Sequence, residues 1–197
     1  MSLLPYASLT HRRRAYRGDD VVLIDSQTPS GASTVSFASG ITSAYSSIMF
    51  KFYDINPGTD SPYFEFQVDD AAGSNGYNDF NITSTFFESY EGEGGEGSNL
   101  AYTTGRDSAA STAFCDITGA IGNGADESFA GELQIFNPSS STYTKQFMAR
   151  TQNHYPGNYA ILVHSAGYID TTTAINAVQF KFTAGVFDGI IKCWGIK

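Results

Sequence analysis

Apolar and polar residues alternate with a period of two along most of this chain. At residues 48–53, for example, Ile48, Phe50 and Phe52 fall on one face of an extended backbone. Successive side chains of a strand point to opposite faces, so each run of this kind predicts a strand with one buried face. Ten such strands are predicted, at residues 21–25, 34–37, 48–53, 63–68, 83–89, 132–136, 145–151, 159–164, 178–182 and 189–196.

Turn sequences such as Asn56-Pro57-Gly58 and Pro156-Gly157-Asn158 separate these runs, and no window of eleven residues shows a sustained helical period. About ten strands with one apolar face each predict an all-β fold, in which two antiparallel sheets pack as a β-sandwich or jelly roll. In the run at 63–68, the face with Glu65 and Gln67 is expected to meet water. The predicted core contains Ile48, Phe50, Phe52, Phe64, Phe66, Val178, Phe180 and Phe182.

Two stretches have the composition of long surface loops. Residues 91–97 alternate glutamate with glycine, and residues 105–129 are rich in Ser, Ala, Gly and Asp. Dense glycine makes regular structure costly in entropy. Because functional residues often lie on loops, both stretches are candidate sites as well as expected surface segments.

Charge divides the chain into a basic arm, residues 1–19, and an acidic β-sandwich domain, residues 20–197. Residues 1–17 hold four of the eleven basic residues and no acidic one, which leaves seven basic and twenty acidic residues, a net charge of −13, for the rest. Phosphate neutralisation drives most nucleic-acid binding, so an acidic domain predicts no nucleic-acid partner. No apolar run approaches ~20 residues, so no membrane insertion is predicted.

Motifs for catalysis and for cofactor binding are missing from the sequence. It has no G-x-S-x-G elbow, no Walker loop and no G-x-G-x-x-G after a strand, and its two cysteines, Cys115 and Cys193, have no metal-ligand spacing. We therefore expect a protein without enzymatic activity and without a cofactor. A polysaccharide hydrolase is the less favoured alternative, because a pair of carboxylates can cleave glycosides.

The acidic loop is a weak candidate for a calcium site. Glu91, Glu93 and Glu96, with Asp69, Asp70 or Asp79, would supply the hard oxygen ligands that Ca²⁺ prefers. The loop also half-matches the calcium-binding repeat of β-rolls, but only one copy is present and that repeat works in stacked copies. The alternative is a flexible, solvated loop.

Tyrosines on the predicted exposed faces form the other candidate surface. Tyrosine suits both sugar stacking and subunit contacts, because its ring is apolar and its tip is polar. With few charges (16%) and forty Ser and Thr residues, the sandwich is expected to associate with copies of itself. Scattered surface tyrosine is the simpler alternative. The candidates are Tyr53, Tyr63, Tyr77, Tyr90 and Tyr102.

The order of these segments resembles a family of small β-sandwich virion proteins from tailed bacteriophages, many of them from marine hosts. The resemblance spans about residues 20–197 and is carried by turn and core residues. It runs from the opening strand at 22–28, through 35–37, 40–45, 48–53, Asn56-Pro57 and Gly76-Tyr77, to residues 185–196. There a glycine-bounded hairpin around Phe187 leads into a strand ending in Gly195-Ile196, with Trp194 where tyrosine is commoner in the family.

The resemblance implies a non-enzymatic structural protein on the exterior of the phage particle, made in the host cytoplasm, as a head decoration or a tail or fibre component. It also implies a homotrimer in contact with other virion proteins. An alternative is a carbohydrate-binding module that attaches the particle to a host surface glycan. The arm lies outside the resemblance, and we expect it to anchor the domain through apolar residues and arginines, namely Leu3, Leu4, Tyr6, Arg12, Arg13, Arg14 and Arg17.

Overall fold

The computed structural model describes residues 20–74 and 76–197, which form twelve β-strands and no helix. The predicted arm contacts Leu3, Leu4, Tyr6, Arg12, Arg13, Arg14 and Arg17 lie outside the described residues. The strands are β1 (Val21–Gln27), β2 (Thr34–Phe37), β3 (Ser47–Pro57), β4 (Phe64–Asp69), β5 (Ile82–Gly92), β6 (Ser98–Tyr102), β7 (Cys115–Asp116), β8 (Phe129–Phe136), β9 (Lys145–Tyr155), β10 (Tyr159–Ile169), β11 (Ala177–Phe182) and β12 (Phe187–Ile196).

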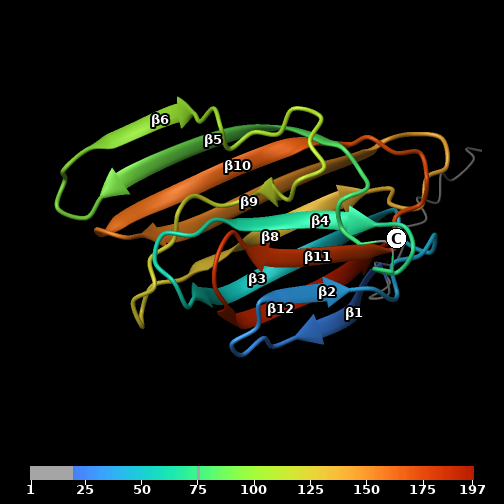
Figure 1. Cartoon of the computed structure of the whole chain (residues 1–197), viewed down its shortest axis with the longest axis horizontal. Coiled ribbons are helices and arrows are strands. Elements are labelled where there is room, and N and C mark those ends of the chain that lie inside the picture. Colours follow the sequence, from blue (N-terminus) through green and yellow to red (C-terminus); the bar gives the residue numbers. More distant parts are fainter. Residues whose placement is uncertain (1–19, 75) are drawn as a thin grey trace, which may run out of the picture.

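These strands build two antiparallel sheets of unequal width. The larger sheet has eight strands in the order β1-β12-β3-β8-β9-β10-β5-β6, and the smaller has four in the order β2-β11-β4-β7. In Figure 1, β2, β11 and β4 lie over one part of the larger sheet, while β10, β5 and β6 extend beyond their edge. The predicted two-sheet β-sandwich is therefore confirmed.

Phenylalanine side chains from both sheets form the centre of the core. The ring of Phe180 on β11 lies against those of Phe50 and Phe52 on β3, with centroids 4.9 and 5.2 Å apart, and stacks on Phe64 of β4 at 5.8 Å. Such pairs contribute about 0.5–1.5 kcal/mol beyond the burial of their area. The eight residues predicted for the core are all at most 3% exposed, which confirms that prediction.

All ten predicted strands form, and the structure adds the short strands β6 and β7. The expectation of an exposed second face on β4 is wrong. Glu65 is only 8% exposed and Gln67 is fully buried. The Gln67 side chain donates to the carbonyl oxygens of Phe80, Thr112 and Ala113. The segment that precedes β5 and the segment that follows β6 in the sequence therefore cover this face.

The expectation that residues 105–129 form a surface loop is wrong for their central part. Residues 115–122 are mostly buried, and Ile117 and Ile121 are fully so. Here the segment runs between β4 and β9: the Ile117 amide donates to the Phe64 carbonyl at 2.9 Å, and the Thr151 hydroxyl donates to the Ile117 carbonyl at 2.7 Å. Ile117 and Ile121 join the core, and the small residues between them let the backbone pass close to β4 and β9. Residues 93–97, by contrast, form the exposed tip of the β5–β6 hairpin.

The two cysteines are separate buried thiols. Cys115 lies on β7 and Cys193 on β12, in different sheets, and neither forms a disulfide. Burial raises the pKa of Cys115 to about 11 and that of Cys193 to about 12. Both thiols therefore stay protonated at neutral pH and pack as small apolar residues.

Replacing the ring at the centre of the core tests this packing. We expect Phe180→Ala to lower the free energy of unfolding by about 3–5 kcal/mol, because it removes a buried ring and leaves a cavity between the sheets. Tyr143, which is 72% exposed, supplies the control: Tyr143→Ala should change stability by no more than about 0.5 kcal/mol. Denaturant titrations of the three proteins measure both values, and a loss below about 1 kcal/mol for Phe180→Ala would contradict this account.

Candidate functional site

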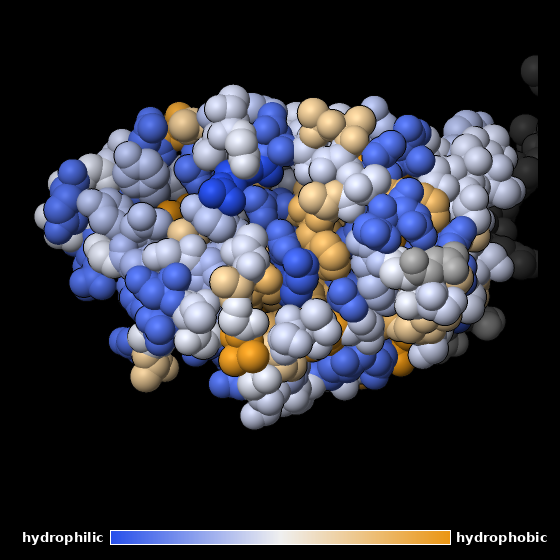
Figure 2. All heavy atoms as spheres, viewed as in Figure 1, coloured by the Kyte–Doolittle hydropathy of each residue, from blue (hydrophilic) through white to orange (hydrophobic). Residues whose placement is uncertain are grey.

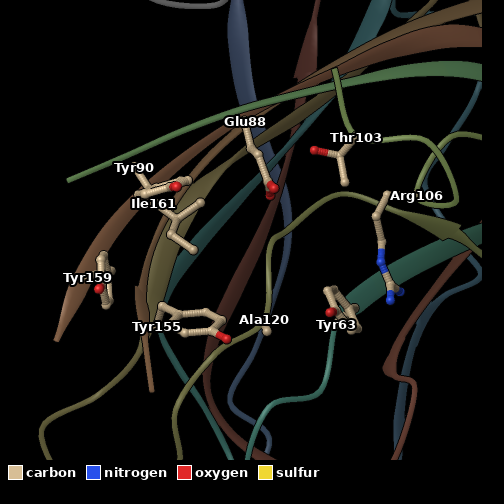
Figure 3. A pocket seen from close by; sticks show the side chains of 9 residues that line it. All are labelled: Tyr63, Glu88, Tyr90, Thr103, Arg106, Ala120, Tyr155, Tyr159 and Ile161. Carbon is tan, nitrogen blue, oxygen red and sulfur yellow. The ribbon is translucent and has the colours of Figure 1, made fainter. Parts of the chain in front are cut away.

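A groove opens where the smaller sheet ends and the inner face of the larger sheet is left partly uncovered. Its volume is about 440 Å³, within the ~300–1,000 Å³ typical of ligand pockets. Figure 3 shows the side chains that line it. One bank comes from β5, β9 and β10 and the other from the segments beside β4 and β7, and the lining residues are Tyr63, Glu88, Tyr90, Thr103, Arg106, Ala120, Tyr155, Tyr159 and Ile161.

Three tyrosines form the bank on the larger sheet. The antiparallel register places Tyr159 of β10 opposite Tyr155 of β9, across the Pro156-Gly157-Asn158 turn. The ring of Tyr159 lies edge to face with those of Tyr90 and Tyr155, at centroid distances of 5.8 and 6.0 Å. Tyr90 and Tyr159 also pack on Ile161, which is buried with Phe86 and Val163 beneath them. The rings are therefore fixed in place before any ligand arrives.

Arg106 forms the opposite bank together with Tyr63. Its guanidinium carbon lies 3.4 Å from the centroid of the Tyr63 ring, and its Nη1 donates to the Asp116 carboxylate at 3.2 Å. The turn that carries Arg106 is attached to the larger sheet, because the Thr103 amide donates to the Phe86 carbonyl at 3.0 Å. A cation stacked on a ring and bound to a carboxylate keeps one orientation.

Glu88 of β5 lies between the two banks. Figure 3 shows its carboxylate pointing into the groove, between the tyrosines and the Arg106 side. The groove thus combines apolar ring surfaces with a carboxylate, a guanidinium and the hydroxyl groups of tyrosine and Thr103. Such a surface can bind a ligand that has both apolar faces and many hydroxyl groups.

Asp116, which is not among the residues that line the groove, forms an ion pair with Arg106. Its side chain is 12% exposed, and burial raises its pKa to about 6, although the hydrogen bond from Arg106 acts in the opposite direction. The nearby charge of Glu65 also raises the pKa. Protonation of Asp116 below pH 6 would therefore weaken the ion pair that orients Arg106.

The structure brings two of the five predicted tyrosines, Tyr63 and Tyr90, into this groove. Tyr53 lies on the other face of the larger sheet, with the Lys192 amino group 5.5 Å from its ring. Tyr102 packs on Phe87 and donates to Asp107, and Tyr77 lies in the segment between β4 and β5. Four groove residues, Glu88, Arg106, Tyr155 and Tyr159, were not among the predicted site residues. For Tyr159 the sequence did hold an indication, because Tyr159 alternates with Ile161 and Val163 and so shares their inward-facing side of the strand.

The predicted calcium ligands are not gathered into a site. Glu91 is the last residue but one of β5. Glu93 and Glu96 lie in the hairpin turn, where the Glu96 carboxylate accepts a hydrogen bond from the Gly94 amide. Among the residues that the structure describes, no three His, Cys, Asp or Glu side chains are grouped to hold a metal ion. Within the same residues, no helix is long and apolar enough to span a membrane.

The outer face of the larger sheet, which points away from the smaller sheet, is a second candidate surface. The register aligns Leu23, Trp194, Met49, Gln134 and Met148 in one row across five strands. Leu23 is 46% exposed and Met148 is 59% exposed. The side of the smaller sheet, by comparison, is mostly hydrophilic with hydrophobic residues scattered over it (Figure 2).

The titration of Asp116 is open to measurement. In the folded chain its pKa of about 6 lies above the ordinary 3.8, so folding favours the neutral acid. This contribution to stability is complete below about pH 4 and is lost as the pH rises through about 6. We expect the Asp116 carboxyl to titrate near pH 6 by NMR, and the native chain to lose stability relative to Asp116→Asn between those pH values. A midpoint near 4 would contradict the burial argument.

Comparisons with known protein families, with curated proteins and with solved structures found no match to this chain. The chain's own chemistry points to two functional surfaces, the groove and the outer face.

Proposed function

We propose that this chain is a non-enzymatic structural module of a bacteriophage particle, displayed on its exterior and assembled with copies of itself through the outer face of the larger sheet. It serves as a head decoration or as a tail or fibre component. The observation that carries the proposal is the largely apolar row on that face, in which Gln134 stands between Met49 and Met148. Exposed apolar residues on β10, β5 and β6 lie on the same face in neighbouring rows.

The composition of this face favours association with a second copy. Beyond the row, Phe87 is 44% exposed, Leu162 37% and Leu100 74%. Contiguous apolar patches larger than a few hundred Å² are uncommon on monomers and mark interaction surfaces. Burial of such residues on association gains about 25 cal/mol for each Å² of apolar area.

Three of the charges on the same face are paired with one another, whereas Lys192, beside Lys51, has its amino group over the Tyr53 ring. Glu132 lies between Lys51 and Arg150 across three neighbouring strands, and its two carboxylate oxygens bind them at 3.2 and 3.3 Å. A second copy would therefore meet a row of mostly paired charges beside an apolar row. Paired charges of this kind oppose self-association much less than unpaired ones of one sign.

The segments on which the resemblance to phage virion proteins depends have structural roles in this fold. Phe187, in the closing hairpin, is 1% exposed. Gly189 has a φ of +137°, and a Cβ there would lie 2.8 Å from the Asp54 carbonyl oxygen, so only glycine fits. These residues let β12 continue as a central strand between β1 and β3.

A charge on the apolar row tests the assembly surface. If the full chain forms a trimer through this face, Met148→Lys should weaken association by at least about tenfold, because it places a charge in each copy of an apolar interface. Thr172→Lys adds the same charge at an exposed position outside the strands, between β10 and β11, and should leave the trimer intact. Light scattering over a concentration series measures the mass of each protein. A native chain that stays monomeric at high micromolar concentration would contradict the assembly surface.

Deletion of residues 1–19 tests the anchoring role proposed for the arm. We expect residues 20–197 to keep the thermal transition of the full chain, because every core residue named above lies within them. The truncated protein should fail to join the particle, since the apolar and arginine contacts are lost. Mass spectrometry of purified particles from cells that make either protein gives the readout. Normal incorporation of the truncated protein would overturn this part of the proposal.

A further inference from the structure

We propose that the groove between β5, β9, β10 and Arg106 binds a neutral carbohydrate, and that Tyr90, Tyr155 and Tyr159 supply the surface on which the sugar rings stack. This inference does not depend on membership of a phage particle. It follows from the shape, the ring geometry and the charges of the groove.

The tyrosine bank suits the apolar side of a sugar ring. A pyranose has a face of C–H groups, which pack against the electron-rich face of an aromatic ring, and hydroxyl groups around its rim. Tyr155 is 37% exposed, and Tyr90 and Tyr159 are partly exposed, so their rings remain accessible although their edges contact one another. An ordinary core cluster would have covered these rings.

The opposite bank supplies polar groups for the rim of the sugar. The Arg106 guanidinium has five N–H donors in a fixed fork. The hydrogen bond to Asp116 uses one of them, so others remain for the hydroxyl groups of a sugar. The stacking of that guanidinium on Tyr63 holds it in place at the edge of the groove. Glu88 offers carboxylate oxygens that accept hydrogen bonds from hydroxyl groups (Figure 3). Polar groups fixed in advance reduce the entropy cost of binding.

The charge around the groove selects against acidic glycans. Asp116 pairs with Arg106, so the Glu88 carboxylate leaves the groove with an acidic character. Sugars that carry a uronic acid or a sulfate would therefore be repelled, whereas neutral hexoses and N-acetylhexosamines would not.

A second hollow, of about 670 Å³, lies on the outer face of the larger sheet, where Gln152, His154 and Ala160 line it. It shares Tyr159 with the groove, but it opens on the opposite side of the sheet. The proposed sugar site is therefore the groove alone.

A glycan array probed with the full chain is the direct experiment. It should carry neutral hexose and N-acetylhexosamine oligosaccharides beside oligosaccharides that contain uronic acid or sulfate. We expect binding to at least one neutral oligosaccharide and weaker or no binding to the acidic ones. Absence of binding to every neutral oligosaccharide at millimolar concentration, or a preference for acidic ones, would overturn the proposal.

Substitutions of the groove tyrosines test whether the oligosaccharide binds in the groove. Calorimetric titration with the best neutral oligosaccharide should show a loss of affinity of about tenfold or more for Tyr155→Ala and for Tyr90→Ala, whereas Tyr155→Phe should keep most of it because the ring remains. Tyr143→Ala removes an exposed tyrosine outside the groove and is the matched control. Thermal transitions of all variants show whether each one is folded.

A substitution of Glu88 tests whether its charge excludes acidic sugars. Glu88→Gln keeps a hydrogen-bonding side chain and removes the charge, so binding of oligosaccharides with uronic acid should increase relative to the native chain. Unchanged affinity of both alanine variants for the neutral ligand would place the sugar outside the groove and overturn the proposal. Unchanged discrimination in Glu88→Gln would overturn the role given to its charge.

Discussion

In this protein a sheet of four strands packs on a sheet of eight, so it can cover only part of the larger sheet's inner face. Most of the structure follows from this difference in width. The phenylalanine cluster around Phe180 joins the two sheets where they overlap. At the edge of the overlap, residues 115–122 lie between the sheets, with Ile117 and Ile121 in the core and hydrogen bonds to Phe64 and Thr151. Beyond that segment, the inner face of β5, β9 and β10 is only partly covered, and it carries tyrosines where the core carries phenylalanines. The groove is thus a consequence of unequal sheets.

The two faces of the larger sheet have different chemistry. The inner face ends in a groove with ring surfaces, a guanidinium and a carboxylate, which suits a small polar ligand. The outer face presents an apolar row from Leu23 to Met148 beside the paired charges of Lys51, Glu132 and Arg150, which suits a large, flat partner. Because the faces lie on opposite sides of one sheet, association through the outer face leaves the groove open. A module that assembles and binds a ligand at the same time needs this separation.

The sequence predicted the strands and the core well because both follow from alternation, a local property. It failed where burial comes from distant segments. The polar face of β4 reads as exposed, yet Gln67 is buried because its amide satisfies the carbonyl oxygens of three residues distant in sequence. Lys145 is likewise fully buried, with its amino group donating to three backbone carbonyls, which no alternation indicates. The groove depends on which strands become neighbours, so only Tyr63 and Tyr90 were among the predicted candidates.

An image reconstruction of the phage particle to which we propose that this chain belongs tests the central claim most directly, because it shows both faces of the domain at once. The account predicts neighbouring copies in contact through the outer face of the larger sheet, with Met148 in the interface and the groove around Tyr155 open to the exterior. Copies in contact through the groove, with the row from Leu23 to Met148 exposed to solvent, would contradict it.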